Sequence, residues 1–224
     1  MPINKGTYQT IKKELDAKQL TLVAVSKTKP IEDILELYNL GQRDFGENYV
    51  QELAEKESQL PKDIRWHFIG HLQTNKVKQI TPFVQLIHGV DSLKLLKEIN
   101  KQAEKAGRVI DCLLQVYIAQ EETKFGLDED ELNFTISQFG NLKTTSTRIC
   151  GLMGMASFTS DINKVRSEFQ KLKKIFDHHA KLITHNSQLI TLSMGMSSDY
   201  KIAIEAGSNM VRIGSLIFGE RAPN

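Results

Sequence analysis

The sequence predicts an α/β fold: a single (β/α)8 TIM barrel with one extra helix at its N-terminus. Short apolar runs alternate with longer stretches of helical period along almost all of the 224 residues. This alternation is typical of strand–helix units repeated around a parallel sheet. No Pro/Gly/Ser-rich linker divides the chain, so we expect one domain over residues 1–224, with residues 1–19 as a helix packed on the barrel.

The expected strands are short apolar runs. The runs at 21–26 and 110–118 are nearly continuous in apolar residues, as expected where both faces of a strand are covered. A doubly wound sheet is the competing fold, but it needs a glycine fingerprint after its first strand, and the sequence there is VSKTKP. We place the eight strands at 21–26, 44–46, 66–69, 86–89, 110–118, 148–153, 189–193 and 210–213.

A stretch of helical period follows each expected strand. Pro30 suits the first turn of the helix after the first strand, and Asp91 is expected to cap a helix that closes before Gly107. We place the helices at 31–40, 49–59, 74–80, 92–106, 129–139, 161–182 and 198–206, with a final turn at 215–218.

Composition excludes several classes of protein. The 29 Lys and Arg residues and 27 Asp and Glu residues give a net charge of +2 without a basic arm, so no nucleic-acid partner is expected. The longest apolar stretches are far shorter than the ~20 residues of a membrane-spanning helix, and the chain starts without an apolar signal region. Cys112 and Cys150 form no CxxC pair, which favours reduced thiols in a cytoplasmic protein. A monomer is expected.

The ends of the expected strands carry the chemistry, because barrels place their reactive groups there. Lys27 ends the first strand, where partial burial would make its amine available to attack an aldehyde; a solvated loop lysine is the alternative. Ser197 after the seventh strand, with Gly214 and Ser215 after the eighth, would place helix N-termini and hydroxyls around an anion. Ordinary serine caps would look the same.

Arg212 lies between Val211 and Ile213 in an enclosed strand, so its charge needs a partner. A carboxylate in a structural salt bridge would serve, and so would a phosphate or a ring nitrogen. A lysine, an anion cradle and a buried arginine around one barrel mouth match the groups that hold pyridoxal phosphate.

Five segments carry a resemblance that covers residues 20–221. The chain resembles the YggS/PROSC family of pyridoxal phosphate homeostasis proteins, which implies a fold-type III barrel like the N-terminal domain of alanine racemase. The segments are GENYVQE (46–52), WHFIGHLQTNK (66–76), GLMGM (151–155), LSMGMSSDY (192–200) and AGSNMVRIGSLIFGER (206–221).

The resemblance also implies roles for single residues. Lys27 would form the Schiff base, or aldimine, and Asn48 would lie beside the cofactor. Arg212 would face the pyridine nitrogen, as in the related racemases, or serve the phosphate. The phosphate would be held by Ser197, Gly214 and Ser215, and the secondary candidates are Lys124, as a weaker aldehyde-binding amine, with Met153 and Ser193.

The chain departs from the family pattern at two positions. Tyr117 stands where the family usually has Asn, which leaves the polar contacts of the fifth strand open. Ser157 stands where the family usually has Pro, and we expect this to alter only a loop. His67 and His71 have the spacing of a metal pair but lack an HExxH glutamate, so no metal site is expected. The segment 71–76 is expected at the barrel mouth, against a ligand or a partner.

Two functions from different classes follow. The chain is expected to be a non-enzymatic carrier that holds pyridoxal phosphate and hands it to apo-enzymes. The alternative is a racemase of low activity, but racemization needs an acid/base group on each face of the substrate carbon, and the related racemases take one from a second domain. We expect the barrel to take up the 224 residues given, which leaves no room among them for that second domain. An unrelated sugar-phosphate barrel enzyme would leave Lys27 and the family segments unexplained.

Overall fold

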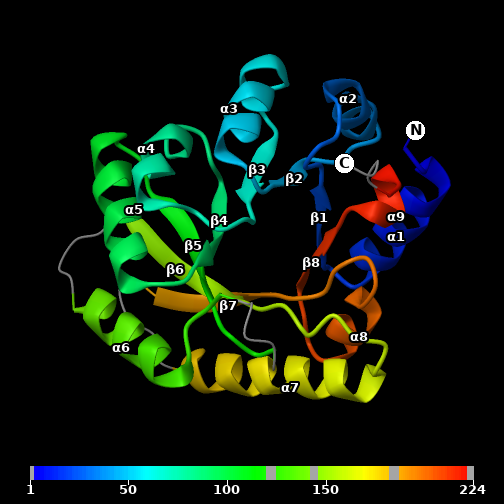
Figure 1. Ribbon diagram of the computed structural model, residues 1–224. Helices are drawn as coiled ribbons and strands as arrows, with labels where there is room; N and C mark the ends of the chain where they lie inside the picture. Colours follow the sequence, from blue (N-terminus) through cyan, green and yellow to red (C-terminus); the bar gives the residue numbers. More distant parts are fainter. Residues whose placement is uncertain (1–2, 120–124, 142–145, 182–186, 221–224) are drawn as a thin grey trace.

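The structure is a computed structural model, and it describes residues 3–119, 125–141, 146–181 and 187–220 (Figure 1). Its parallel strands follow one another around a closed barrel in the order β1 to β8, and β8 pairs with β1. The predicted (β/α)8 barrel is therefore confirmed. The strands are β1 Thr21–Val25, β2 Asp44–Glu47, β3 Arg65–Phe68, β4 Leu86–Val90, β5 Ile110–Gln115, β6 Thr147–Met153, β7 Ser187–Ser193 and β8 Met210–Ile213.

Helices lie around the outside of the barrel (Figure 1). The first, α1 (Lys5–Ala17), precedes β1 and packs against β1 and the last helix. No helix in the described ranges is long and apolar enough to cross a membrane. The other helices are α2 Ile31–Asn39, α3 Val50–Gln59, α4 Val77–Ile80 after the 3-10 turn η1 Thr74–Lys76, α5 Leu93–Lys105, α6 Glu129–Gly140, α7 Ile162–His179, α8 Tyr200–Glu205 and α9 Ser215–Phe218.

Helix ends follow capping chemistry, with one correction. The predicted cap Asp91 is wrong: Ser92 is the N-cap of α5, and its side chain accepts the N–H of Leu95. Asp91 instead accepts a hydrogen bond from the His71 ring at 3.0 Å. Gly107 follows α5 with a φ of 62°, the left-handed conformation expected of glycine beyond a helix end.

The fifth strand is shorter than the apolar pattern indicates. Beyond Gln115 the backbone turns to Leu127, whose N–H donates to Gln115 O and whose carbonyl accepts the N–H of Tyr117. Val116 still donates its N–H to Met153 O of β6, and it forms an isolated bridge with Leu127. Val116 and Ile118 are buried and Tyr117 is half-buried, so apolar burial continues past the end of β5, which explains why the sequence overextends the strand.

The barrel encloses its own small core, separate from the larger one between sheet and helices. This inner cluster is made by Val23, Leu86, Leu113, Met153 and Met210. Polar side chains share the same interior, since His88 and Ser193 have no exposed surface and Arg212 is 4% exposed. The barrel interior therefore holds both packed apolar side chains and buried polar ones. The candidate site lies at the end of the barrel where the strands have their carboxyl ends.

Candidate functional site

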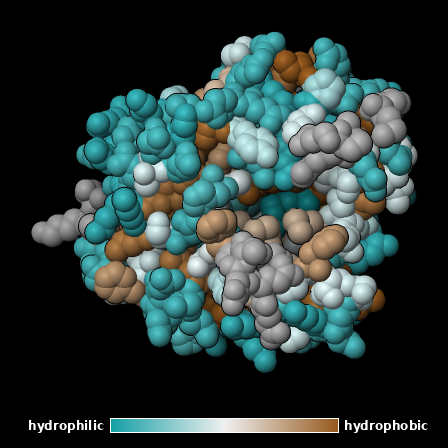
Figure 2. Space-filling view, in the orientation of Figure 1, coloured by the Kyte–Doolittle hydropathy of each residue, from teal (hydrophilic) through white to brown (hydrophobic). Residues whose placement is uncertain are grey.

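The residues expected to hold a ligand lie at neighbouring strand ends. Lys27 and Asn48 follow β1 and β2, while Ser197 and Ser215 follow β7 and β8. In the closed barrel β7, β8, β1 and β2 are consecutive, so these chain segments meet at one sector of the mouth. Figure 2 shows a hollow in the surface over the barrel, with hydrophilic side chains at its floor.

The loops after β7 and β8 are joined by a direct contact. The Gly214 N–H donates to Ser197 Oγ at 3.2 Å. A Cβ at Gly214 would lie 3.2 Å from the Val25 carbonyl oxygen, so glycine allows β8 to pass close to the end of β1. Ser197 is half-buried and Ser215 is exposed at the start of α9. Through this contact the loops that carry Ser197 and Ser215 meet beside the end of β1.

The expected helix start after β7 needs correction. Helix α8 begins at Tyr200, two residues later than expected, and Asp199 occupies its N-cap position. The Asp199 carboxylate accepts the Met196 N–H at 2.6 Å, which closes a turn before the helix. An acidic side chain thus already occupies the N-terminal end of α8, where it would disfavour an anion.

Lys27 is half-buried in a loop that both neighbours hold in place. On one side, the Lys56 ammonium donates a hydrogen bond to the Ser26 carbonyl oxygen at 2.8 Å. Thr28 on the other side has a φ of 62°, and its N–H donates to Glu52 Oε1 at 2.6 Å. A β-branched residue in the left-handed region is strained, so the surrounding contacts fix this conformation.

A buried charge cluster supports that loop from below. Glu47 Oε1 accepts from Ser26 Oγ at 2.6 Å and from Lys56 Nζ at 2.8 Å. Lys56 also contacts Glu52 Oε1 at 2.6 Å. Burial raises the pKa of Glu47, and the Lys56 charge opposes that rise. Sequence reasoning missed this cluster, although the i,i+4 spacing of Glu52 and Lys56 on a predicted helix was the available signal.

Asn48 presents an unsatisfied atom at the end of β2. Its Oδ1 is buried and has no hydrogen-bond partner among the residues that the structure describes. Gly70 packs against the same residue so closely that a Cβ there would lie 2.3 Å from the Asn48 carbonyl oxygen. A buried acceptor without a partner is costly, so a ligand that donates to it would recover that cost.

Arg212 is held by neutral oxygens. Its guanidinium donates to Ser193 O at 2.9 Å, to Ser193 Oγ at 2.6 Å and to Gly154 O at 3.1 Å. Burial lowers the pKa of Arg212 to about 10, and the Asp199 charge opposes that shift. Ser193 therefore touches Arg212 directly, and Met153 precedes the carbonyl that holds its other nitrogen. The guanidinium keeps a charge that an anionic or electron-rich ligand could use.

Three other expectations concern residues around the mouth. Lys124 lies outside the described residues. Tyr117 is half-buried beyond the end of β5. Ser157 does more than alter a loop: its N–H and hydroxyl donate to the buried Glu168 carboxylate of α7 at 2.6 and 2.7 Å. Proline could supply neither donor.

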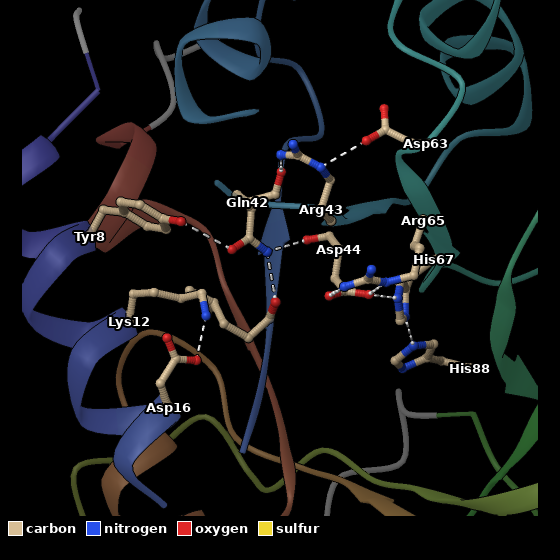
Figure 3. Close-up of polar contacts among 11 residues, drawn as sticks. Tyr8, Lys12, Asp16, Gln42, Arg43, Asp44, Asp63, Arg65, His67 and His88 are labelled. Carbon is tan, nitrogen blue, oxygen red and sulfur yellow. Dashed lines mark hydrogen bonds and ion pairs between the residues drawn. The ribbon is translucent and has the colours of Figure 1, made fainter. Parts of the chain in front are cut away.

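His67 and His71, in and just after β3, lie in different surroundings. His71 is exposed, stacks on Phe125 with ring centroids 5.0 Å apart and contacts Asp91, so it lies where strand-end loops meet. His67 is buried in the barrel and bonds to Asp44 and His88 (Figure 3). Among the described residues no three His, Cys, Asp or Glu side chains gather as metal ligands would.

Comparison with known proteins gives three consistent findings. Residues 5–222 match the family described as alanine racemase, N-terminal domain. A pyridoxal phosphate homeostasis protein of Pongo abelii is 42% identical over 232 residues, covering 98% of this chain and 84% of the relative. Another, from Aquifex aeolicus (strain VF5), is 42% identical over 201 residues, covering 89% of this chain and 86% of the relative.

A solved structure shares the whole fold. PipY of Synechococcus elongatus PCC7942, solved with PLP bound, superimposes with a TM-score of 0.87 at 32% identity. The match covers 96% of this chain and 99% of that chain. The likeness therefore extends over the barrel and its helices together.

Proposed function

The chain belongs to the pyridoxal phosphate homeostasis proteins, within the alanine racemase N-terminal domain family, and from this premise we propose that it binds pyridoxal 5'-phosphate (PLP). In this proposal Lys27 Nζ attacks the PLP aldehyde, a C=N bond forms and water leaves. The protein then takes part in intracellular PLP homeostasis and passes the cofactor to apo-enzymes.

The phosphate is assigned to the joined loops after β7 and β8. Ser197 and Ser215 offer hydroxyls, and the glycine at 214 lets the backbone approach an anion closely. The observation that carries the assignment is the Gly214 N–H to Ser197 Oγ contact beside the end of β1, because it brings an anion-binding group next to the loop of Lys27.

Asn48 and Arg212 complete the proposed site. The unpartnered Asn48 Oδ1 fits a polar group of the cofactor, and the Arg212 guanidinium fits either the pyridine nitrogen or the phosphate. Ser193 and Met153 act through Arg212, and Lys124 stays a proposed second amine. A guanidinium at the pyridine nitrogen would leave the ring unprotonated, so the cofactor would be a weaker electron sink.

That electronic argument favours a carrier without enzymatic turnover. The names of the relatives, homeostasis proteins and not racemases, agree with it. We also propose that the carrier is monomeric and cytoplasmic. Low racemase activity is the competing function, and it is favoured only by the family to which the barrel belongs.

The test begins with purified protein and PLP. A visible absorption band should form, and borohydride reduction followed by peptide mass spectrometry should place the adduct on Lys27. Lys27→Ala should lose both signals, whereas Lys29→Arg, which keeps the charge two residues away but removes an amine, should retain them. An adduct confined to other lysines would refute the Lys27 assignment. Amino-acid turnover above roughly 1 per second, within the ordinary enzyme range, would refute the carrier.

A further inference from the structure

A polar path crosses the otherwise apolar interior of the barrel. It runs from the mouth, at Arg212 and Ser193, through His88 and His67 to Asp44 of β2 (Figure 3 shows the part from His88 to Asp44). His88 has no exposed surface and His67 is 3% exposed. Two buried imidazoles in direct contact are unused by the proposed cofactor site and call for an explanation.

Each link of the path is a hydrogen bond of ordinary length. Ser193 Oγ lies 3.2 Å from His88 Nδ1, and His88 Nε2 lies 2.9 Å from His67 Nδ1. His67 Nε2 lies 3.0 Å from Asp44 Oδ1. Both nitrogens of each ring are therefore engaged, so the position of every proton on the path depends on its neighbour.

The two ends of the path fix its direction. Asp44 is ionised and held by Arg65 Nε at 2.7 Å, so it can only accept, and His67 Nε2 must carry a hydrogen. A neutral His67 then accepts at Nδ1 from His88 Nε2–H. His88 in turn accepts at Nδ1 from the Ser193 hydroxyl, and Ser193 Oγ accepts from Arg212. All donors point from Arg212 toward Asp44.

His88 is a neutral imidazole on this path. Burial first, and then the nearby His67 and Arg212 charges, hold its pKa well below its ordinary value. Its single ring hydrogen therefore lies on Nε2, toward His67, and its Nδ1 accepts from Ser193.

We infer that His67 and His88 are positioning residues for Arg212. Through Ser193 they hold the guanidinium at the mouth and connect its hydrogen bonding to Asp44 at the opposite end of the barrel. The hydrogen-bond path itself rests on geometry alone, whereas its effect on PLP rests on the proposed function.

The remaining groups around the two rings leave this link intact. Arg65 neutralises Asp44 from β3, and Asp111 of β5 is paired with Arg148. Cys150 of β6 is a neutral thiol, since burial raises its pKa to about 12. The apolar groups of the inner cluster supply the rest of the lining: Val23, Leu86, Leu113, Met153 and Met210.

The decisive experiment is 15N-histidine NMR on the protein without PLP at pH 8. Spectra of His67→Gln and His88→Gln assign two of the six histidines. We expect the His88 hydrogen on Nε2, pointing at His67, and the His67 hydrogen on Nε2, pointing at Asp44. A His88 that carries its hydrogen on Nδ1 overturns the inference.

Ser193→Ala tests the link to Arg212. Without the Ser193 hydroxyl, His88 Nδ1 loses its donor, so the 15N resonance of His88 Nδ1 should move toward that of an imidazole nitrogen that accepts no hydrogen bond. Ser208→Ala is the matched control: within the described residues, the buried Ser208 side chain bonds to backbone atoms of β7, β8 and the loop after β7. Equal effects of both substitutions on the His88 Nδ1 resonance would contradict the link.

The cofactor arm is separate. With PLP, Ser193→Ala should raise the Kd roughly tenfold at pH 8, because one hydrogen bond to a charged group is lost. Ser208→Ala should leave the Kd unchanged. An unchanged Kd for Ser193→Ala would refute the effect on PLP. If PLP does not bind at all, the proposed function fails while the NMR result still decides the hydrogen-bond chain.

Discussion

At the scale of single residues, the surroundings decide what a charged side chain does. Lys27 and Lys56 are the same residue type, yet Lys27 is half-buried in a loop at the mouth while Lys56 is buried between two carboxylates. Arg212 and Arg148 differ in the same way, since Arg212 is enclosed and the Arg148 side chain is 64% exposed. Position on a strand or loop end separates each pair, which is why strand-end reasoning singles out Lys27 and Arg212 as candidates.

Replacing Arg212 tests its proposed contact with PLP. Arg212→Ala should weaken PLP binding by roughly tenfold to a hundredfold, the range of one charge-assisted hydrogen bond, while the fold persists. Equilibrium dialysis gives the Kd, and far-UV circular dichroism checks the fold. Arg148→Ala, which breaks an exposed pair with Asp111, is the control and should leave the Kd unchanged. An unchanged Kd for Arg212→Ala would make this arginine purely structural.

Asp44 predicts a pH dependence of stability. Burial would raise the pKa of Asp44, but hydrogen bonds from Arg65 and His67 outweigh it and lower the pKa to about 2 from an ordinary value of 3.8. A lowered carboxyl pKa stabilises the fold above the ordinary value, by about 2 kcal/mol, and this contribution is lost as the pH falls from about 4 to about 2.

Urea unfolding at pH 7 and pH 3 measures that contribution. The original protein should lose about 1 kcal/mol more than Asp44→Asn over this interval, because about half of the contribution has gone by pH 3. Asp130→Asn, at an exposed position of α6, should behave like the original protein. Parallel losses in the original protein and Asp44→Asn would contradict the assignment.

At the scale of elements, α3 supports the loop after β1 from a neighbouring unit. Its Lys56 reaches the Ser26 carbonyl and the Glu47 carboxylate, and its Glu52 receives the Thr28 N–H. The helix thereby joins the ends of β1 and β2, which carry Lys27 and Asn48. Ser157 and Glu168 do the same for the loop after β6 and α7.

Lys56→Met should show how much the cluster stabilises the fold. Removing one partner of a buried pair leaves Glu47 uncompensated, so the free energy of unfolding should fall by about 3–5 kcal/mol. Adding Glu47→Gln should recover part of the loss, because the orphaned charge is then absent. Lys62→Met, in an exposed pair with Glu57, is the control, and chemical denaturation is the measurement. A fall for Lys56→Met as small as that of the control would contradict the role.

The sequence predicts elements well where the period is clear and fails where burial has another cause. The bounds of β8 and α9 agree with the expectation, whereas residues 116–118 continue the apolar pattern past the end of β5, where the backbone pairs with Leu127. The expected helix at 74–80 begins as a 3-10 turn, and α8 starts late because a turn, closed by the Met196 N–H on the Asp199 carboxylate, precedes it. Strand positions single out Lys27 and Arg212 as candidates, but the Glu47 and His88 contacts join distant segments that no local pattern connects.

At the scale of the whole molecule, hydrogen bonds join α1 and the residue before it to segments near the start and near the end of the barrel sequence. The Asn4 N–H donates to Ile217 O of α9 at 2.7 Å, and the Tyr8 hydroxyl contacts Gln42 Oε1 at 3.4 Å (Figure 3). Gln42 in turn donates to the carbonyls of Leu22 and Asp44. Hydrogen bonds therefore connect α1 to α9 and, through Gln42, to β1 and β2. We propose that the first helix and the barrel form one domain.

This connection predicts one cooperative unfolding transition that includes α1. Leu15 of α1 has no exposed surface, so Leu15→Ala should lower the free energy of unfolding by about 2–5 kcal/mol through lost burial and the cavity left behind. Leu35→Ala, at a 39% exposed position of α2, is the control and should cost much less. Fluorescence of Trp66, in β3, and far-UV circular dichroism should report one common urea midpoint for Leu15→Ala, at a lower urea concentration than the common midpoint of the original protein. A Trp66 transition that keeps its midpoint while the helical signal shifts would show that α1 folds separately from the barrel.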